Sequence, residues 1–132
     1  MQMKTFDDIQ VNDKVYYAII DKDFNISSPK ISWVANKKEE PFERCWEITL
    51  ANNFKFDVYK GRFDAESFYG FVDVIIYSTS EENLKDAIED LINRKINDYE
   101  YRLRNIQSDI KELRKTEKTL KNYISTLESK LS

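Results

Sequence analysis

The chain has 132 residues, a net charge of −3, no histidine, one cysteine, two glycines and two prolines. This length suits one small domain or a smaller domain with an appendage, and the counts exclude histidine chemistry, cysteine-based zinc sites and glycine-rich phosphate loops. We therefore expect a protein that is not an enzyme and that holds no cofactor and no metal.

The composition changes at residues 78–80. Residues 1–80 contain 15 of the 18 aromatic residues and every glycine and proline, and their apolar residues mostly recur with a period of two. Residues 81–132 have neither glycine nor proline and follow a helical period. Because such a switch marks a boundary between strands and helix, we predict an α+β chain with a small β-barrel domain over 1–80 and a long helix over 81–132.

The first 80 residues contain five short segments that alternate in the manner of strands: 14–20, 31–35, 45–50, 54–58 and 71–77. The first segment is apolar on both faces, which suggests a central strand. Asn52-Asn53 tolerates the left-handed backbone of a tight hairpin between the third and fourth segments. In the last segment we expect Val72, Val74 and Ile76 to point inward. Five strands of this length predict a small antiparallel barrel or a strongly curled sheet.

Two stretches between these segments are expected to be loops. Residues 37–41 are charged and end in a proline, which indicates an exposed loop. Gly61 and Gly70 bracket residues 62–69, which we predict to form a short helical turn that closes the barrel or a recognition loop.

Residues 9–16 read Ile-Gln-Val-Asn-Asp-Lys-Val-Tyr. This stretch resembles the opening of many SH3-like barrels, small phage proteins among them, which read I-x-V-G-D-x-V. Asn12 replaces the glycine of that pattern, and asparagine also accepts a positive φ, so the turn is expected to survive. The resemblance implies an SH3-like barrel and no particular activity, because barrels of this kind have many functions.

The start of the helix carries a capping signal. Ser78 and Thr79 each precede a glutamate by three residues, Glu81 and Glu82 respectively, which is the spacing of a capping box. Residues 81–90 are mainly acidic and residues 111–121 mainly basic, which matches the helix dipole. The sequence therefore predicts a helix that begins close to residue 80.

From residue 92 onward, apolar residues recur in steps of four and three, as in a coiled coil. Leu84, Ile88 and Leu91 precede this repeat, and we expect them to pack on the barrel. Eleven of the twelve seam positions over 92–131 are Ile, Leu or Tyr. The predicted oligomerisation seam consists of Ile92, Ile96, Tyr99, Leu103, Ile106, Ile110, Leu113, Glu117, Leu120, Ile124, Leu127 and Leu131.

Isoleucine at heptad position a and leucine at position d in the C-terminal half favour a parallel homodimer. A parallel dimer would pair Lys95 with Glu100 and Asp109 with Arg114 of the other copy. Glu117, at position a, would then face its own copy, which is unfavourable unless Lys118 or Lys121 relieves the charge. An antiparallel dimer, a trimer, a partner helix and a fold-back near 114–119 remain open.

Two further groups of residues could bind a partner. Four aromatic residues of the barrel are candidates for a partly exposed binding patch: Tyr16, Trp33, Tyr59 and Tyr69. A basic stripe on the helix could contact nucleic acid, although charges over 81–132 balance at eleven of each sign: Lys111, Arg114, Lys115, Lys118 and Lys121.

These features favour a non-enzymatic interaction protein that dimerises through its helix and displays a barrel surface to a partner protein. Lysine outnumbers arginine 15 to 6, a bias of AT-rich coding sequences, which suits a phage or mobile-element protein that blocks a host factor such as a defence system. The alternatives are a nucleic-acid-binding regulator, a structural component of a virion or secretion machine, and an enzyme or small-ligand binder with a site at the dimer interface. With no apolar signal or membrane segment, we expect a cytoplasmic location, in the host if phage-encoded.

Overall fold

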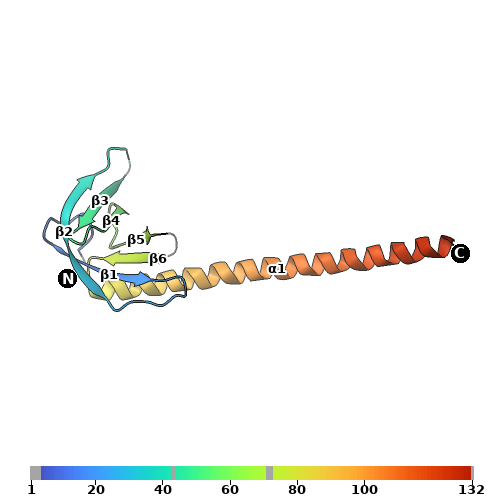
Figure 1. The fold of residues 1–132 in the computed structure, drawn as a ribbon. Helices are drawn as coiled ribbons and strands as arrows, with labels where there is room; N and C mark the ends of the chain where they lie inside the picture. The colour runs from blue at the N-terminus through green and yellow to red at the C-terminus, as the bar shows by residue number, and fades with distance from the viewer. Residues whose placement is uncertain (1–3, 43, 71–72, 132) are drawn as a thin grey trace. The chain divides into compact units, whose positions relative to one another are not determined.

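A computed structural model of the chain describes residues 4–42, 44–70 and 73–131, with Tyr69 described only by its backbone. The chain divides into two compact units, Met1–Leu91 and Ile92–Ser132. The described chain forms six strands followed by one helix, and Figure 1 labels them along the ribbon. The elements are β1 (Lys14–Ile20), β2 (Lys30–Glu39), β3 (Cys45–Leu50), β4 (Lys55–Tyr59), β5 (Asp64–Tyr69), β6 (Asp73–Ser78) and α1 (Glu81–Leu131).

The six strands form one antiparallel sheet in the order β4-β3-β2-β1-β6-β5. The sheet curls until its two edge strands, β4 and β5, face each other in a nearly closed barrel. The predicted α+β class with a small antiparallel barrel and a long C-terminal helix is therefore confirmed. The barrel has six strands, so the predicted number of five is wrong.

The additional strand is β5, which occupies the segment predicted to be a helical turn or a recognition loop. Gly61 and Gly70 adopt φ values of +83° and +67°, so each makes a turn at one end of this segment. The residues of β5 between the two turns are extended. Between them the side chains of Ala65 and Ser67 face the barrel interior, where Ala65 is buried and the Ser67 hydroxyl lies 3.0 Å from the Tyr77 hydroxyl. The burial of this segment alternates as in a strand. The inward residues are small or polar, so the sequence shows no hydrophobic period there.

β2 is longer than predicted and includes residues 37–39, so the loop predicted over 37–41 is wrong for those three residues. Its pairing with β3 shifts register between Val34 and Asn36. A bulge of this kind bends a strand and increases its twist. This bend lets the ten-residue strand pair with β1 at one end and with β3 at the other.

β1 is central, as predicted, and both of its faces are covered. Val15 and Tyr17 are buried in the barrel interior, whereas Ala18 and Ile20 pack against the first turns of α1. Those turns contribute four residues: Leu84, Ala87 and Leu91 are buried, and Ile88 is partly buried. The expected packing of the first helical turns on the barrel is thus observed.

β6 is also apolar on both faces, which alters one prediction. Ile75 and Tyr77 point into the barrel interior, while Val74 and Ile76 belong to the cluster formed with the helix. The prediction that Val74 and Ile76 face the barrel interior is therefore wrong, because the helix supplies a second apolar layer for them. Val72 lies outside the described residues.

An aromatic cluster fills the barrel. The rings of Phe56 and Tyr77 stack with centroids 3.9 Å apart, and Phe6 meets the edge of Phe56 at 5.5 Å. Phe6 precedes β1 and is fully buried, and its backbone N–H donates to the carbonyl of Arg62 at 2.9 Å. The segment before β1 is therefore part of the core, a role for which the sequence pattern gave no signal beyond Ile9, which is also buried.

Two asparagines adopt the left-handed backbone expected of them. Asn53 has a φ of +70° and donates its N–H to the Leu50 carbonyl, which closes the hairpin between β3 and β4. Asn12 has a φ of +76°, so the turn before β1 forms without the glycine of the SH3-like pattern. Both positions confirm that asparagine serves here where glycine is more usual.

The cap of α1 differs from the predicted one. The Ser80 hydroxyl accepts a hydrogen bond from the Asn83 N–H at 3.1 Å, and the Ser80 carbonyl accepts from the Leu84 N–H at 3.0 Å. Ser80 is therefore the N-cap, in place of Ser78 or Thr79. Ser78 instead accepts a hydrogen bond from the Ser80 N–H at 3.3 Å, and the buried Thr79 hydroxyl has no hydrogen-bond partner among the described residues.

We predict that Ser80→Ala lowers the free energy of unfolding by about 1 kcal/mol, because it removes the N-cap acceptor. The matched change Thr79→Val removes a hydroxyl that accepts no such bond, so it should leave the stability within about 0.5 kcal/mol of the parent or raise it. Urea denaturation followed by circular dichroism measures both. A larger loss for Thr79→Val than for Ser80→Ala would contradict the assigned cap.

Candidate interaction surfaces

The four aromatic candidates do not form one patch. Tyr16 is half-buried beside the helix cluster, Trp33 is 48% exposed on β2, and Tyr59 is 69% exposed on β4. The side chain of Tyr69 lies outside the described part of the structure. The barrel therefore offers two separate surfaces with candidate aromatics, one around Trp33 and one around Tyr59.

The first surface lies on the outer face of the β1–β2 ladder. Tyr16 is paired across the ladder with Ile31, and Trp33 is paired with Lys14, so these four side chains share one face. Ile31 is 46% exposed and lies between the two aromatic residues, although the sequence analysis did not select it. Ile31 lies two residues before Trp33 on the same strand, so the two side chains share one face, and this spacing could have identified Ile31 from the sequence.

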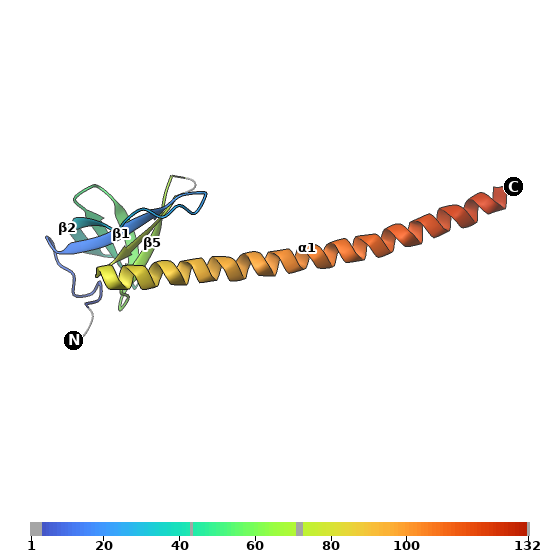
Figure 2. The same ribbon diagram turned by 90° about the horizontal axis from the view of Figure 1, so that it is seen from below.

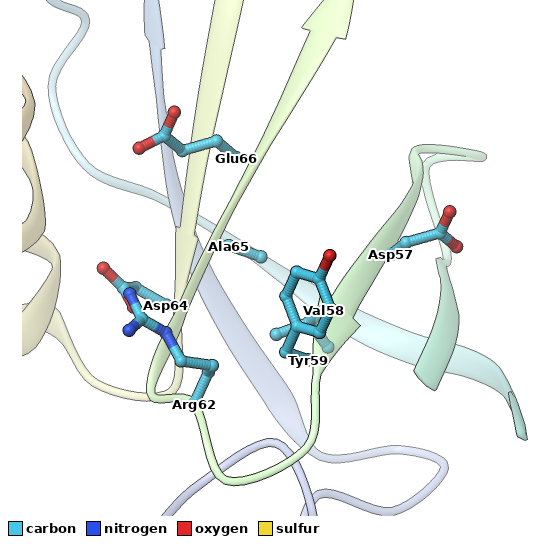
Figure 3. Close-up of a pocket in the computed structure, with 7 residues that line it drawn as sticks. All are labelled: Asp57, Val58, Tyr59, Arg62, Asp64, Ala65 and Glu66. Atoms are coloured by element: carbon cyan, nitrogen blue, oxygen red, sulfur yellow. The ribbon is translucent and has the colours of Figure 1, made fainter. Parts of the chain in front are cut away.

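The second surface is a groove between the edge strands β4 and β5, and it has a volume of about 540 Å³. Figure 3 shows Val58, Tyr59 and Ala65 in the space between these strands. Val58 and Ala65 are buried members of the barrel core. No ladder joins β4 to β5 in the described residues, so the groove lies where the sheet fails to close.

Acidic residues dominate the rims of this groove. Asp57 lies on the β4 rim, and Asp64 and Glu66 lie on the β5 rim (Figure 3). The Arg62 guanidinium forms an ion pair with the Asp64 carboxylate at 3.1 Å, and the Lys55 ammonium lies 3.5 Å from the Glu47 carboxylate on the neighbouring strand. The carboxylates that line the groove and its extension are Glu47, Asp57, Asp64 and Glu66, against the two cations Lys55 and Arg62.

A cluster around Trp46 fixes the segment before β1 instead of forming a binding site. The indole N–H donates to the Asp7 carboxylate at 2.7 Å, and the Gly61 N–H donates to the same carboxylate at 2.9 Å. The ammonium groups of Lys37 and Lys60 lie 4.2 and 4.8 Å from the centre of the Trp46 ring. Trp46 and Asp7 thus contact each other, and Lys37, Lys60 and Gly61 of the barrel supply their other contacts.

The same contacts shift two pKa values. The hydrogen bonds from Trp46 and Gly61, helped by the charges of Lys37 and Lys60, hold the pKa of Asp7 below its ordinary value. Desolvation lowers the pKa of Lys37, although nearby carboxylates, Asp7 first among them, oppose the shift. The Lys37 ammonium donates to the backbone carbonyls of Asp7 and Ile9 at 2.8 and 2.9 Å, which attaches this segment to β2.

We predict that Asp7→Asn destabilises the barrel at neutral pH and that this difference shrinks in acid. A carboxyl with a lowered folded pKa stabilises the fold above its unfolded value, near about 4, and loses that effect as the pH falls through the folded value. Urea midpoints of the parent and Asp7→Asn should therefore converge between about pH 4 and pH 2. Asp8→Asn, an equal charge change, is the control, and a similar pH-dependent loss there would contradict the assignment.

In the second unit, Ile92–Ser132, the helix continues without a break (Figure 2). All eleven apolar residues of the predicted seam are exposed, from 38% for Ile92 to 88% for Leu131. Single exposed apolar residues are ordinary, but a continuous stripe of this length is typical of interaction surfaces. The structure shows the stripe and leaves the coiled coil itself a prediction.

Charged groups beside the seam are arranged in pairs. The Lys121 ammonium lies 2.8 Å from the Glu117 carboxylate, so the acidic residue at the seam has the partner that the sequence analysis required. Lys115 pairs with Glu112 at 3.4 Å and Arg102 with Asp98 at 3.1 Å. Two members of the basic stripe are thus engaged with carboxylates of the same helix.

Four members of the basic stripe, Lys115 among them, lie along one shallow depression of the helix. Lys111, Arg114, Lys115 and Lys118 line it together with Ile110. The structure therefore brings four of the five predicted stripe residues together on one exposed surface. The exposed ion pairs along the helix, such as that of Lys115 with Glu112, contribute little to stability, about 0.3–0.5 kcal/mol each.

No helix in the described residues is long and apolar enough to cross a membrane. Comparisons with protein-family models, with curated protein sequences and with solved structures give no match to this chain. The function must therefore be argued from the two units themselves.

Proposed function

We propose that the protein is a non-enzymatic interaction protein that forms a homodimer through residues 92–131 and presents its barrel to a partner protein. The composition favours a phage or mobile-element origin, in which this partner would be a host factor that the protein blocks, such as a component of a defence system. Two linked barrels would bind such a partner with avidity, because the second contact becomes intramolecular.

The observation that carries the proposal is the exposed seam. Eleven large apolar side chains follow one stripe of the helix, and each gains about 1.5 kcal/mol or more when it is removed from water. An isolated helix cannot bury its own stripe, since all of these side chains point to one side. A second copy of the same stripe is the simplest cover, because it brings an identical repeat in the same register.

The charges support the parallel arrangement. In a parallel dimer, Lys95 would meet Glu100 and Asp109 would meet Arg114 of the other copy, both attractive. The ion pair with Lys121 reduces the repulsion that Glu117 would meet from its own copy. In an antiparallel dimer centred on the seam, Lys95 would meet Lys130, which is repulsive, and Glu100 would meet Lys121, which is attractive, so the balance of charges there is less favourable.

We predict that the chain has the mass of a dimer in light scattering and that Leu113→Lys converts it to a monomer. Leu113 is 68% exposed in the single chain and lies at a d position in the middle of the seam, where a lysine would place two charges in the interface. Lys115→Ala, two residues away and off the seam, should leave the mass unchanged. A monomeric parent chain would contradict the homodimer.

We predict that Leu103→Cys forms a disulfide between copies under mild oxidation. In a parallel dimer the two cysteines would face each other at position a, whereas in an antiparallel dimer Leu103 would face Leu120 and the two copies of residue 103 would lie about 25 Å apart. Cys45 is buried, so the added thiol is the accessible one. Cross-linking that requires the double variant Leu103→Cys/Leu120→Cys would show the antiparallel arrangement.

A further inference from the structure

The boundary between the two compact units divides the charges of the chain unequally. Residues 1–91 contain 11 lysines and arginines against 18 acidic residues, a net charge of −7, whereas residues 92–132 contain 10 against 6, a net charge of +4. The balance of charges over 81–132 conceals this difference, because the five acidic residues of 81–90 belong to the first unit. The second unit therefore has the positive charge that binding of a polyanion requires.

The positive charge of the second unit is concentrated on one face of the helix. In the heptad register of the seam, positions b and f are the ones farthest from a partner helix. Eleven residues between 92 and 131 occupy these positions, and all six acidic residues of the unit lie elsewhere in the heptad. The cations at positions b and f are Arg94, Arg104, Lys111, Lys115 and Lys118.

Four of these cations form a continuous line, which we call the outer ridge: Arg104, Lys111, Lys115 and Lys118. Arg104, Lys111 and Lys118 recur every seven residues, about two helical turns, so they follow one another along the helix with Lys115 beside them. The three lysines border the same shallow depression, and all four side chains are exposed. At about 1.5 Å per residue the ridge extends over roughly 21 Å.

The outer ridge differs from the basic stripe predicted from the sequence. Arg114 and Lys121 occupy e positions beside the seam, and Lys121 is paired there with Glu117. Within the described residues, Lys115 is the one member of the ridge that forms an ion pair, with Glu112 at 3.4 Å. Because an exposed pair of this kind is weak, an incoming anion can replace the carboxylate.

The residue types of the ridge indicate its ligand. Protein interfaces are centred on apolar and aromatic residues, and single-stranded nucleic acids stack their bases on aromatic rings. From Arg104 to Lys118, positions b and f contain only four cations and Ser108, so they offer neither. Contacts to the phosphates of a duplex need only cations and polar donors, which is what this face contains.

We propose that the outer ridge binds the phosphate backbone of double-stranded DNA without reading its sequence. Each of the four cations would neutralise one phosphate. The negative charge of residues 1–91 disfavours contact of DNA with the first unit, so binding would be confined to the helix beyond residue 91. This activity goes beyond the proposed association and does not depend on it, because positions b and f stay outside a coiled-coil dimer.

The test measures binding of the full chain to a labelled, mixed-sequence duplex of about 30 base pairs by fluorescence anisotropy. Four neutralised phosphates predict that the logarithm of the association constant falls against the logarithm of the salt concentration with a slope of about −3.6. The affinity should therefore drop roughly 100-fold between about 50 and 200 mM salt. A second mixed-sequence duplex should bind within about twofold of the first, because phosphate contacts carry no sequence information.

Paired variants separate the ridge from the total charge. Lys111→Gln/Lys118→Gln should halve the salt slope and weaken binding at low salt by at least about tenfold. Glutamine has nearly the helix propensity of lysine, so the dichroism of the helix should be unchanged. Lys111→Arg/Lys118→Arg, which keeps both charges, should bind within about twofold of the parent, and so should Lys22→Gln/Lys30→Gln, an equal charge change at exposed lysines of the first unit.

Four results would overturn the inference. They are no binding of the duplex at low salt, equal losses for the ridge variant and for Lys22→Gln/Lys30→Gln, tighter binding of a single strand of the same length, and equally effective competition by poly-glutamate, which would assign the ridge to an acidic protein. Light scattering on the same samples tests the homodimer separately. A monomer that binds the duplex contradicts only the dimer, and a dimer that does not bind it contradicts only the ridge.

Discussion

The barrel depends on a sheet that is apolar on both faces at its centre. β1 and β6 each direct one set of side chains into the barrel and the other set outward, and the outward set includes Ala18, Ile20 and Ile76. A curled sheet covers only its inner face, so the outer one requires another layer. Leu84 and Leu91 of the first helical turns supply it, which explains why the compact unit extends to Leu91 and does not end with the last strand.

Much of this fold could be predicted from the sequence, because alternation is strong where strands are apolar. β1 and β3 have the bounds that the pattern predicted, and Asn12 and Asn53 adopt the positive φ expected of them. β5 was missed because its inward residues are small or polar, as Ala65 and Ser67 show, and such residues give no hydrophobic period. The cap was displaced because three neighbouring hydroxyl residues compete, and only tertiary packing selects Ser80.

The candidate surfaces were less predictable for a different reason. The seam lies on one helix and is defined by a repeat within it, so the local sequence is enough to identify the seam residues. The groove exists because two strands that are neighbours in the chain fail to pair, and this depends on how the whole sheet curls. Tyr59 was selected as an exposed aromatic residue, yet nothing in the sequence placed Ala65 and Asp64 opposite it. Open sheet edges are also sites of unwanted pairing, and the acidic rims discourage contact between like copies.

The environment of Trp46 gives the two units separate optical signatures. Both tryptophans of the chain lie in the barrel, and Trp46 has two ammonium groups over its ring and its indole N–H bonded to Asp7. Its emission should respond as soon as the segment before β1 detaches. The helix contains no tryptophan but spans 51 residues, so it dominates the far-ultraviolet dichroism. Fluorescence and dichroism recorded on one sample can therefore follow the opening of the barrel and the melting of the helix as two independent events.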